Sequence, residues 1–202
     1  MAFVDMKPGT LLAPVPAVLI SCAAEGVRPN AMTAAWAGTV NSEPPMVSVS
    51  VRPERWSYHI IRESGEFVVN LCGEALLRAT DYCGVRSGRD GDKLAACGLT
   101  TVPVRGLKWA PAIARSPLYL GCRVRSVTEL GSHHLFVGEI TAMGVRDDLL
   151  DEKGKIRFER AKLIAYNHGV YYGLGQALGF FGYSVAAPDV LRRRMKELSA
   201  AE

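Results

Sequence analysis

The clearest structural signal in the chain is Val47-Ser48-Val49-Ser50-Val51-Arg52, in which every second residue is a valine. Successive side chains of a β-strand point to opposite faces, so this alternation predicts a strand with one apolar and one polar face. Strand character recurs in residues 16–21, 66–71, 118–127 and 134–143, which Gly, Pro and Asp clusters separate. The sequence therefore predicts a mainly β fold built from antiparallel strands.

Short helical patterns lie between these strands, over residues 57–63, 74–82 and 90–97, with Asp90 as the expected N-cap of the third. They do not alternate regularly with the strands, as the helices of a doubly wound parallel sheet would. We therefore expect a β-barrel decorated by short helices. The even-numbered residues from 118 to 124 should share one face of their strand, with Tyr119, Arg123 and Arg125 on the other.

Composition limits both the fold and the partners. A chain of 202 residues with 49% apolar residues can build one globular unit with its own core. The net charge is only +4, and residues 192–194 supply three of the positive charges, which argues against a nucleic-acid-binding surface. No apolar run approaches the ~18 residues that a membrane span needs, and no signal-peptide pattern is present. We expect a cytoplasmic protein outside the membrane.

Cysteines and histidines do not form a metal-binding pattern. The five cysteines contain no C-x-x-C pair, and the four histidines lack H-E-x-x-H spacing, so we expect buried reduced thiols and no metal site. Residues 173–179 are glycine-rich but have one residue too many before the third glycine for a dinucleotide fingerprint. The G-x-S-x-G elbow of serine hydrolases is also missing.

A first candidate binding segment combines hydroxyl and cationic side chains. Ser48, Ser50 and Arg52 share the polar face of the predicted strand, and Arg55 and Ser57 follow at the next turn. Alternate residues of a strand lie about 7 Å apart, so these groups can follow an extended ligand that ends in an anion. Phosphate is the natural choice, and a solvated sheet face is the alternative.

A second candidate phosphate site is Ser87-Gly88-Arg89-Asp90, with Lys93 one helical turn further on. A Ser-Gly turn before a helix offers backbone N–H groups at the positive end of the helix dipole, and Arg89 and Lys93 add charge. The alternative is an ordinary capped loop with surface charges.

A third segment, Asn30-Ala31-Met32-Thr33-Ala34-Ala35-Trp36, is rich in small residues and ends in an aromatic ring. Small side chains let a flat ligand ring approach the backbone, whose amides can bind its polar edge. A core position is the alternative for Trp36. His168 is the histidine that we expect nearest a ligand, with a hydrogen-bonded structural imidazole as its alternative.

Taken together, these segments resemble the flavin reductase family with the FMN-binding split β-barrel, particularly its branch of flavoredoxins and archaeal ferric reductases. The resemblance covers residues 1–185 as one domain and leaves 186–202 as a tail, in which a helix is expected over residues 191–198. Its carriers are Asn30-Ala31-Met32-Thr33 with Trp36, the strand at 47–52 with Arg55 and Ser57, Glu66-Phe67-Val68-Val69-Asn70, Asp81-Tyr82-Cys83-Gly84 with Ser87-Gly88-Arg89-Asp90 and Lys93, and Glu129-Leu130-Gly131-Ser132-His133. The Cys72-Gly73 pair departs from the family pattern.

The resemblance implies a split β-barrel of Greek-key type and a homodimer that holds each FMN near the subunit contact. Asn30, Ala31, Met32, Thr33 and Trp36 would then face the flavin ring or its linker, and Ser48, Val49 and Ser50 would line the ring and ribityl chain. The candidates around the phosphate are Arg52, Ser57, Ser87, Gly88, Arg89 and Lys93. Which of the two basic clusters holds the phosphate stays open.

The implied activity is hydride transfer from NADH or NADPH to the flavin, which then reduces free flavin, a ferric complex or a protein acceptor. The cofactor performs this chemistry, so no acid-base pair is required. The first alternative is a flavoredoxin-like electron carrier that works with a redox partner protein and has no efficient nicotinamide turnover. The second is a binding module for pyridoxal phosphate or haem. His168 could contact the nicotinamide from the opposite subunit, and Cys83 could tune the flavin.

Overall fold

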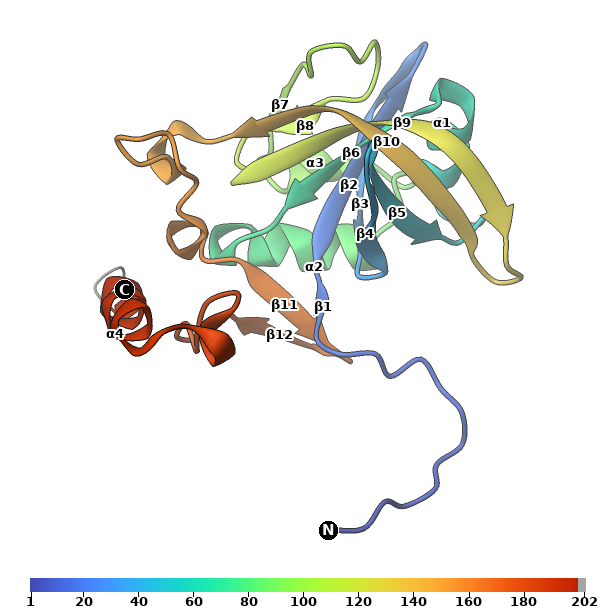
Figure 1. Cartoon of the computed structure of the whole chain (residues 1–202). Coiled ribbons are helices and arrows are strands. Elements are labelled where there is room, and N and C mark those ends of the chain that lie inside the picture. Colours follow the sequence, from blue (N-terminus) through green and yellow to red (C-terminus); the bar gives the residue numbers. More distant parts are fainter. Residues whose placement is uncertain (200–202) are drawn as a thin grey trace.

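The structure, a computed structural model, describes residues 1–199 and is organised around one seven-stranded antiparallel sheet (Figure 1). In spatial order its strands are β3 (Val27–Ala34), β2 (Val18–Ala24), β6 (Glu66–Leu71), β9 (Leu118–Glu129), β10 (His134–Val145), β5 (Pro45–Val51) and β4 (Ala37–Ser42). Every neighbouring pair is antiparallel. The predicted mainly β fold with short helices is confirmed.

The sheet curls into a barrel because its two edge strands follow each other in the chain. β3 and β4 lie at opposite edges of the strand order, yet only residues 35 and 36 separate them in sequence. The backbone N–H of Ser50 on β5 donates to the carbonyl of Trp36 at 2.9 Å, which ties this connection to the far side of the sheet. Register shifts in β10, where one strand bulges against its partner, bend the sheet further.

Alternation along the strands fills the barrel. Val47, Val49 and Val51 are all buried in the main core with Phe67 and Phe136, as the period of two predicts. β2 is buried along its whole length because its other face packs under the helices. Leu120, Cys122 and Val124 contact the main core, as expected for one face of their strand, whereas Tyr119 packs against a separate cluster that includes Val104 and Leu107.

The helices cover one side of the barrel. They are α1 (Trp56–Ser64), η1 (Glu74–Leu76), α2 (Leu77–Val85) and α3 (Lys93–Ala96). Ile60 and Ile61 of α1 enter the main core, and α1 ends at Gly65, whose φ of 67° is left-handed. The expectation that Asp90 caps the third helix is wrong. Asp92 is the N-cap, because its carboxylate accepts the N–H of Ala95 at 3.0 Å.

The remaining elements lie around this barrel. They are β7 (Thr101–Val102), β8 (Ala112–Ile113), η2 (Asp147–Leu149), η3 (Phe158–Ala161), η4 (Tyr183–Val185), α4 (Pro188–Ser199), and a small sheet of β1 (Val15–Pro16), β11 (Ile164–Asn167) and β12 (Val170–Gly173). α4 contains the residues 191–198 expected to be helical, and the tail residues 200–202 lie outside the described part. Within residues 1–199, no helix is both long and apolar enough to cross a membrane. All five cysteines are free thiols.

Two buried polar residues of β6 fasten the segment between β7 and β9 to the barrel. The Glu66 carboxylate, 6% exposed, accepts the backbone N–H groups of Lys108, Trp109 and Ala110 at 2.8–3.2 Å. The amide oxygen of Asn70 accepts the N–H of Ile113 at 2.8 Å. These contacts satisfy backbone groups that burial would otherwise leave without partners.

Candidate functional site

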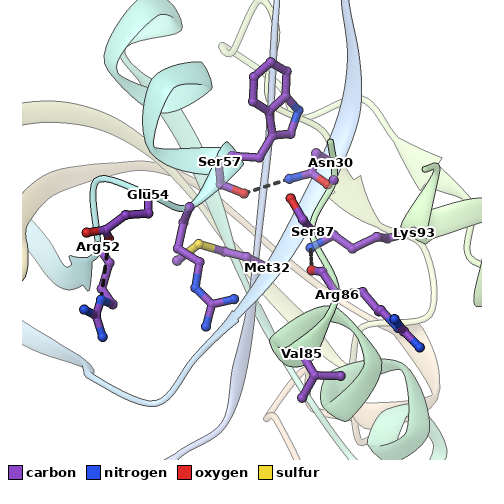
Figure 2. A pocket seen from close by; sticks show the side chains of 12 residues that line it. Asn30, Met32, Arg52, Glu54, Ser57, Val85, Arg86, Ser87 and Lys93 are labelled. Carbon is purple, nitrogen blue, oxygen red and sulfur yellow. Dashed lines mark hydrogen bonds and ion pairs between the residues drawn. The ribbon is translucent and has the colours of Figure 1, made fainter. Parts of the chain in front are cut away.

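A pocket of about 450 Å³ opens between the start of α1, strand β3 and the loop that joins α2 to α3 (Figure 2). Its lining residues are Asn30, Met32, Arg52, Glu54, Arg55, Trp56, Ser57, Val85, Arg86, Ser87, Gly88 and Lys93. Hydroxyl, amide and cationic side chains dominate this list. The volume is in the range of about 300–1,000 Å³ that small-molecule sites usually have.

The two basic clusters of the sequence meet in this pocket. Arg52, Arg55 and Ser57 come from the end of β5 and the start of α1, while Ser87 comes from the loop before α3 and Lys93 is the first residue of α3. Four cationic side chains line the pocket against one carboxylate, Glu54, which pairs with Arg52 at 3.5 Å. The arrangement favours an anion, because the remaining positive charges lack acidic partners within residues 1–199.

Lys93 places a buried positive charge beneath the pocket. The side chain belongs to a residue only 5% exposed, and its Nζ donates to the carbonyls of Cys83 at 3.2 Å and Arg86 at 3.1 Å. Burial removes water from the ammonium and lowers the pKa of Lys93, since desolvation disfavours the charged form. An anion in the pocket would restore the stabilisation that water supplies in the unfolded chain.

Asn30 joins the two halves of the pocket. Its Nδ2 donates to Ser57 Oγ at 2.8 Å, so the serine oxygen accepts this hydrogen bond. Its Oδ1 packs against Gly88, where an added Cβ would lie 2.4 Å from that oxygen and 2.7 Å from Trp56 Cδ1. Glycine is therefore required for this close approach of loop to helix. Arg55 adds a hydrogen bond of 2.8 Å from Nη1 to the carbonyl of Gly84.

A second compartment of about 170 Å³ continues from the first and shares Met32, Arg52 and Arg55 with it. Its further lining residues are Thr33, Ala34, Ala35, Trp36, Ser50, Val51 and His133. Trp36 is 43% exposed, so its ring forms a wall and does not belong to the core. The His133 ring lies 4.6 Å from it between centroids. The two compartments together form one groove, cationic at one end and aromatic at the other.

His133 is expected to be neutral at pH 7. Partial burial and the positive charges of Arg52 and Arg55 lower its pKa, against a smaller opposing effect of Glu54. Because protonated imidazole quenches indole emission, acidification should dim Trp36 with a midpoint below the ordinary value of about 6.5. The measurement is tryptophan fluorescence from pH 8 to 5, with His133→Gln subtracted as the control. A His133-dependent midpoint above 6.5 would contradict this arrangement.

Most of the sequence-predicted site residues line this groove. They are Asn30, Met32, Thr33, Trp36, Ser50, Arg52, Ser57, Ser87, Gly88 and Lys93. The hydroxyl of Thr33 is already engaged, because it donates to the carbonyl of Thr80 on α2.

Other predicted site residues lie away from the lining. Ala31 and Val49 are buried core residues, and Ser48 Oγ donates to the carbonyl of Gly38 at 3.3 Å. The Arg89 guanidinium lies over the Trp56 ring, 5.5 Å from its centroid. His168 is exposed in the turn between β11 and β12, with a left-handed φ of 41°.

Cys83 does not offer a thiolate to the groove. Its side chain is fully buried, and burial raises the pKa of the thiol to about 12. Within residues 1–199 no group of three or more His, Cys, Asp or Glu side chains is arranged to hold a metal ion.

The sequence analysis did not propose part of the lining as ligand contacts: Glu54, Trp56, Val85 and Arg86 in the larger compartment, and Val51 and His133 in the smaller one. Ala34 and Ala35 do belong to the small-residue segment that was expected beside a flat ligand ring. Arg86 directly precedes Ser87, so the basic residues of that turn could have pointed to Arg86 as a further ligand contact. Trp56 and His133 had no comparable local signal, because their place in the groove depends on how α1 and the β9–β10 hairpin pack.

Comparison with known proteins supports the same fold. A family model described as flavin reductase like domain matches residues 11–175. The flavoredoxin of Desulfovibrio vulgaris is 31% identical, with a TM-score of 0.82 over 89% of this chain and 97% of that one. The flavoredoxin of Methanosarcina acetivorans is 28% identical, with a TM-score of 0.84 over 92% of this chain and 100% of that one.

Relatives in sequence extend this picture. An uncharacterized protein of Archaeoglobus fulgidus is 34% identical over 132 residues, which cover 65% of this chain and 74% of the relative. A high molecular weight rubredoxin of Moorella thermoacetica is 29% identical over 128 residues, or 62% of this chain and 54% of that protein.

Proposed function

The chain belongs to the flavin reductase like domain family, and on this basis we propose that it is an FMN-dependent oxidoreductase that takes hydride from NADH or NADPH. Its acceptor is a free flavin, a ferric complex or a protein. The observation that carries the proposal is the convergence of two basic clusters, about 30 residues apart in sequence, on one end of a groove whose other end is aromatic.

The chemistry of the donor set fits FMN, which has a dianionic phosphate at one end and a flat tricyclic ring at the other. At the cationic end, Ser57, Ser87, Arg55 and Lys93 would hold the phosphate through hydroxyl and charge-assisted hydrogen bonds. At the other end, small side chains at Ala34 and Ala35 leave the space beside Trp36 that a ring needs. Ser50 and Met32 line the groove between the two ends.

When bound, FMN supplies hydride acceptance and electron release, and the protein provides binding, orientation and control of water. Asn30 fixes Ser57 Oγ through a 2.8 Å hydrogen bond, which directs the serine proton away from the amide. Lys93 holds the Cys83 and Arg86 carbonyls, so the shape of the loop and the charge beneath it depend on one side chain. Neutral His133 and Trp36 form the wall where a planar substrate ring could stack.

Anaerobic mixing with NADH or NADPH tests this function. Protein reconstituted with FMN should show the absorbance of bound flavin, and that absorbance should bleach within seconds of coenzyme addition. A protein that binds no FMN, or whose bound FMN never bleaches, would overturn the reductase assignment.

Lys93→Met should weaken FMN binding at least tenfold and leave riboflavin binding nearly unchanged. Riboflavin lacks the phosphate that the buried ammonium would attract, and a charge-assisted hydrogen bond is worth about 1.5–3 kcal/mol. Flavin fluorescence quenching measures both affinities, and exposed Lys153→Met is the control with the same charge change. Equal losses for both flavins would assign Lys93 a purely structural role.

A second candidate function is that of an electron carrier without efficient nicotinamide turnover. Both flavoredoxins and the relative named a rubredoxin favour it, since these names belong to electron carriers. Stopped-flow reduction separates the two candidates. A carrier would be reduced faster by a reduced rubredoxin-type protein than by either nicotinamide coenzyme.

We propose a second copy of the chain as the structural partner, with the flavin near the contact. Large apolar side chains are exposed at both ends of the chain: Met1, Phe3, Val4, Met6, Leu11 and Leu12, and then Leu174, Leu178, Phe181, Tyr183 and Val185. Single soluble chains rarely leave so many apolar side chains uncovered. Light scattering should give about twice the chain mass of 21.9 kDa, and a mass near 21.9 kDa would rule the dimer out.

A further inference from the structure

Three guanidinium groups form what we call the rim of the cationic pocket: one lines the pocket, and the other two contact residues of its lining. Arg86 lines the pocket, Arg89 lies over the ring of the lining residue Trp56, and Arg28 on β3 donates to the carbonyl of Gly88, another lining residue. We propose that this rim, Arg28, Arg86 and Arg89, binds the 2′-phosphate of NADPH and makes it the preferred coenzyme over NADH. The inference rests on the proposed hydride transfer from a nicotinamide coenzyme.

The charge of the pocket exceeds what one flavin phosphate can neutralise. A phosphate monoester carries about −1.5 to −2 at pH 7. Arg52 already pairs with Glu54 at 3.5 Å, and Arg55 and Lys93 supply two further positive charges to the pocket lining. The three rim arginines come in addition to these. None of the three forms an ion pair within residues 1–199, so they are available to a second anionic group.

The contacts that position the rim arginines are to backbone carbonyls and an aromatic ring, and none is an ion pair. Arg28 Nη2 donates to the carbonyl of Gly88 at 3.1 Å. The Arg89 guanidinium is 5.5 Å from the Trp56 ring centroid, a cation–π distance, and its backbone N–H donates to Ser87 Oγ at 3.2 Å. The carbonyl of Arg86 accepts a hydrogen bond from Lys93 Nζ, which fixes the backbone at Arg86. The side chain of Arg86 itself is exposed. The loop therefore presents its guanidiniums from a fixed backbone.

The residue type points to a terminal phosphate. Guanidinium is a planar fork that binds two phosphate oxygens at once, and a phosphate monoester offers three terminal oxygens to several such forks. Pyrophosphate, which NADH and NADPH share, is more often held by backbone N–H groups at a helix N-terminus. Arginine beside the adenine ribose is the usual means of accommodating the 2′-phosphate. The rim of arginines thus discriminates between NADPH and NADH at the 2′-phosphate, which only NADPH carries.

Direct binding provides the first test. Isothermal titration of the FMN-loaded protein uses 2′-phospho-AMP and AMP, which differ only in the added 2′-phosphate, as probes. We expect 2′-phospho-AMP to bind at least tenfold more tightly than AMP, and Arg86→Gln with Arg89→Gln to abolish most of that difference. The effect should shrink as salt is raised, because exposed charges are screened.

Coenzyme selectivity provides the second test. The ratio of kcat/KM for NADPH to that for NADH should exceed ten in the wild-type protein and fall about tenfold or more in the Arg86→Gln, Arg89→Gln double variant. Arg78→Gln removes one positive charge from an exposed position on α2 outside the pocket and should leave the ratio unchanged. Flavin affinity, measured in parallel, reports whether the loop is still folded.

The outcomes separate this inference from the function on which it rests. Equal kcat/KM for both coenzymes, or a ratio that the double variant does not alter, overturns the rim assignment while hydride transfer stands. If neither coenzyme bleaches the flavin, the proposed reductase function fails, and the titration alone decides about the rim. In that case 2′-phospho-AMP binding that the double variant loses supports a 2′-phosphate site, and binding no tighter than that of AMP rejects it.

Discussion

Gly88→Ala is expected to weaken FMN binding about 10- to 100-fold. The new Cβ would lie 2.4 Å from Asn30 Oδ1 and 2.7 Å from Trp56 Cδ1, both far inside contact distance. Asn30 would have to move, and with it the hydrogen bond that fixes Ser57 Oγ. Overpacking of this kind costs about 1–3 kcal/mol. Here the strain would displace the loop and helix that form the phosphate end of the groove, and FMN affinity would drop accordingly.

Gly91→Ala is the matched control, because it lies in the same loop and an added Cβ there meets nothing within 4 Å. Flavin fluorescence titration should show nearly wild-type FMN affinity for Gly91→Ala. Equal affinity in the two variants would mean that the contact between Gly88, Asn30 and Trp56 does not shape the flavin site.

Glu66→Ala is expected to lower the free energy of unfolding by about 3–5 kcal/mol. The change removes the acceptor of three backbone N–H groups, those of Lys108, Trp109 and Ala110, in a place where the residue is 6% exposed. Each buried N–H left without a partner costs about 1–3 kcal/mol. The segment that packs Val104 and Leu107 over Tyr119 would loosen with it.

Urea unfolding followed by tryptophan fluorescence measures this loss, and exposed Glu63→Ala on α1 is the control for removing a carboxylate. Glu63→Ala should change stability by less than about 0.5 kcal/mol, as surface substitutions usually do. A Glu66 variant as stable as the Glu63 variant would show that water can replace the carboxylate.

Strand prediction worked where large apolar residues alternate. β5 is the clearest case, since Val47, Val49 and Val51 are buried as the period of two requires. β3 was read as a ligand-binding segment and not as a strand, because Pro29 and small residues hide its periodicity. It is an edge strand of the sheet, where proline is tolerated, and pairing with β2 imposes its extended form.

Site prediction identified most residue types but not their grouping. The segments at 48–57 and 87–93 each suggested a phosphate site, and the sequence left open which one was used. In the structure Ser57 and Ser87 line the same pocket, with Asn30 bonded to Ser57 and packed on Gly88. The two clusters are separate segments of the sequence, but in the folded chain they line the same pocket, so the choice between them does not arise.

The sequence by itself determined the mainly β class, the apolar face of each strong strand, the short helices and the presence of hydroxyl, cationic and small residues suited to a phosphorylated ring. These features depend on neighbours within a few residues, so periodicity and composition record them. Only the tertiary structure decided that both basic clusters face one pocket, that Arg89 lies over Trp56 and that His133 lies beside Trp36. Such contacts join residues far apart in the chain, and only the curling of the sheet and the packing of helices on it bring them together.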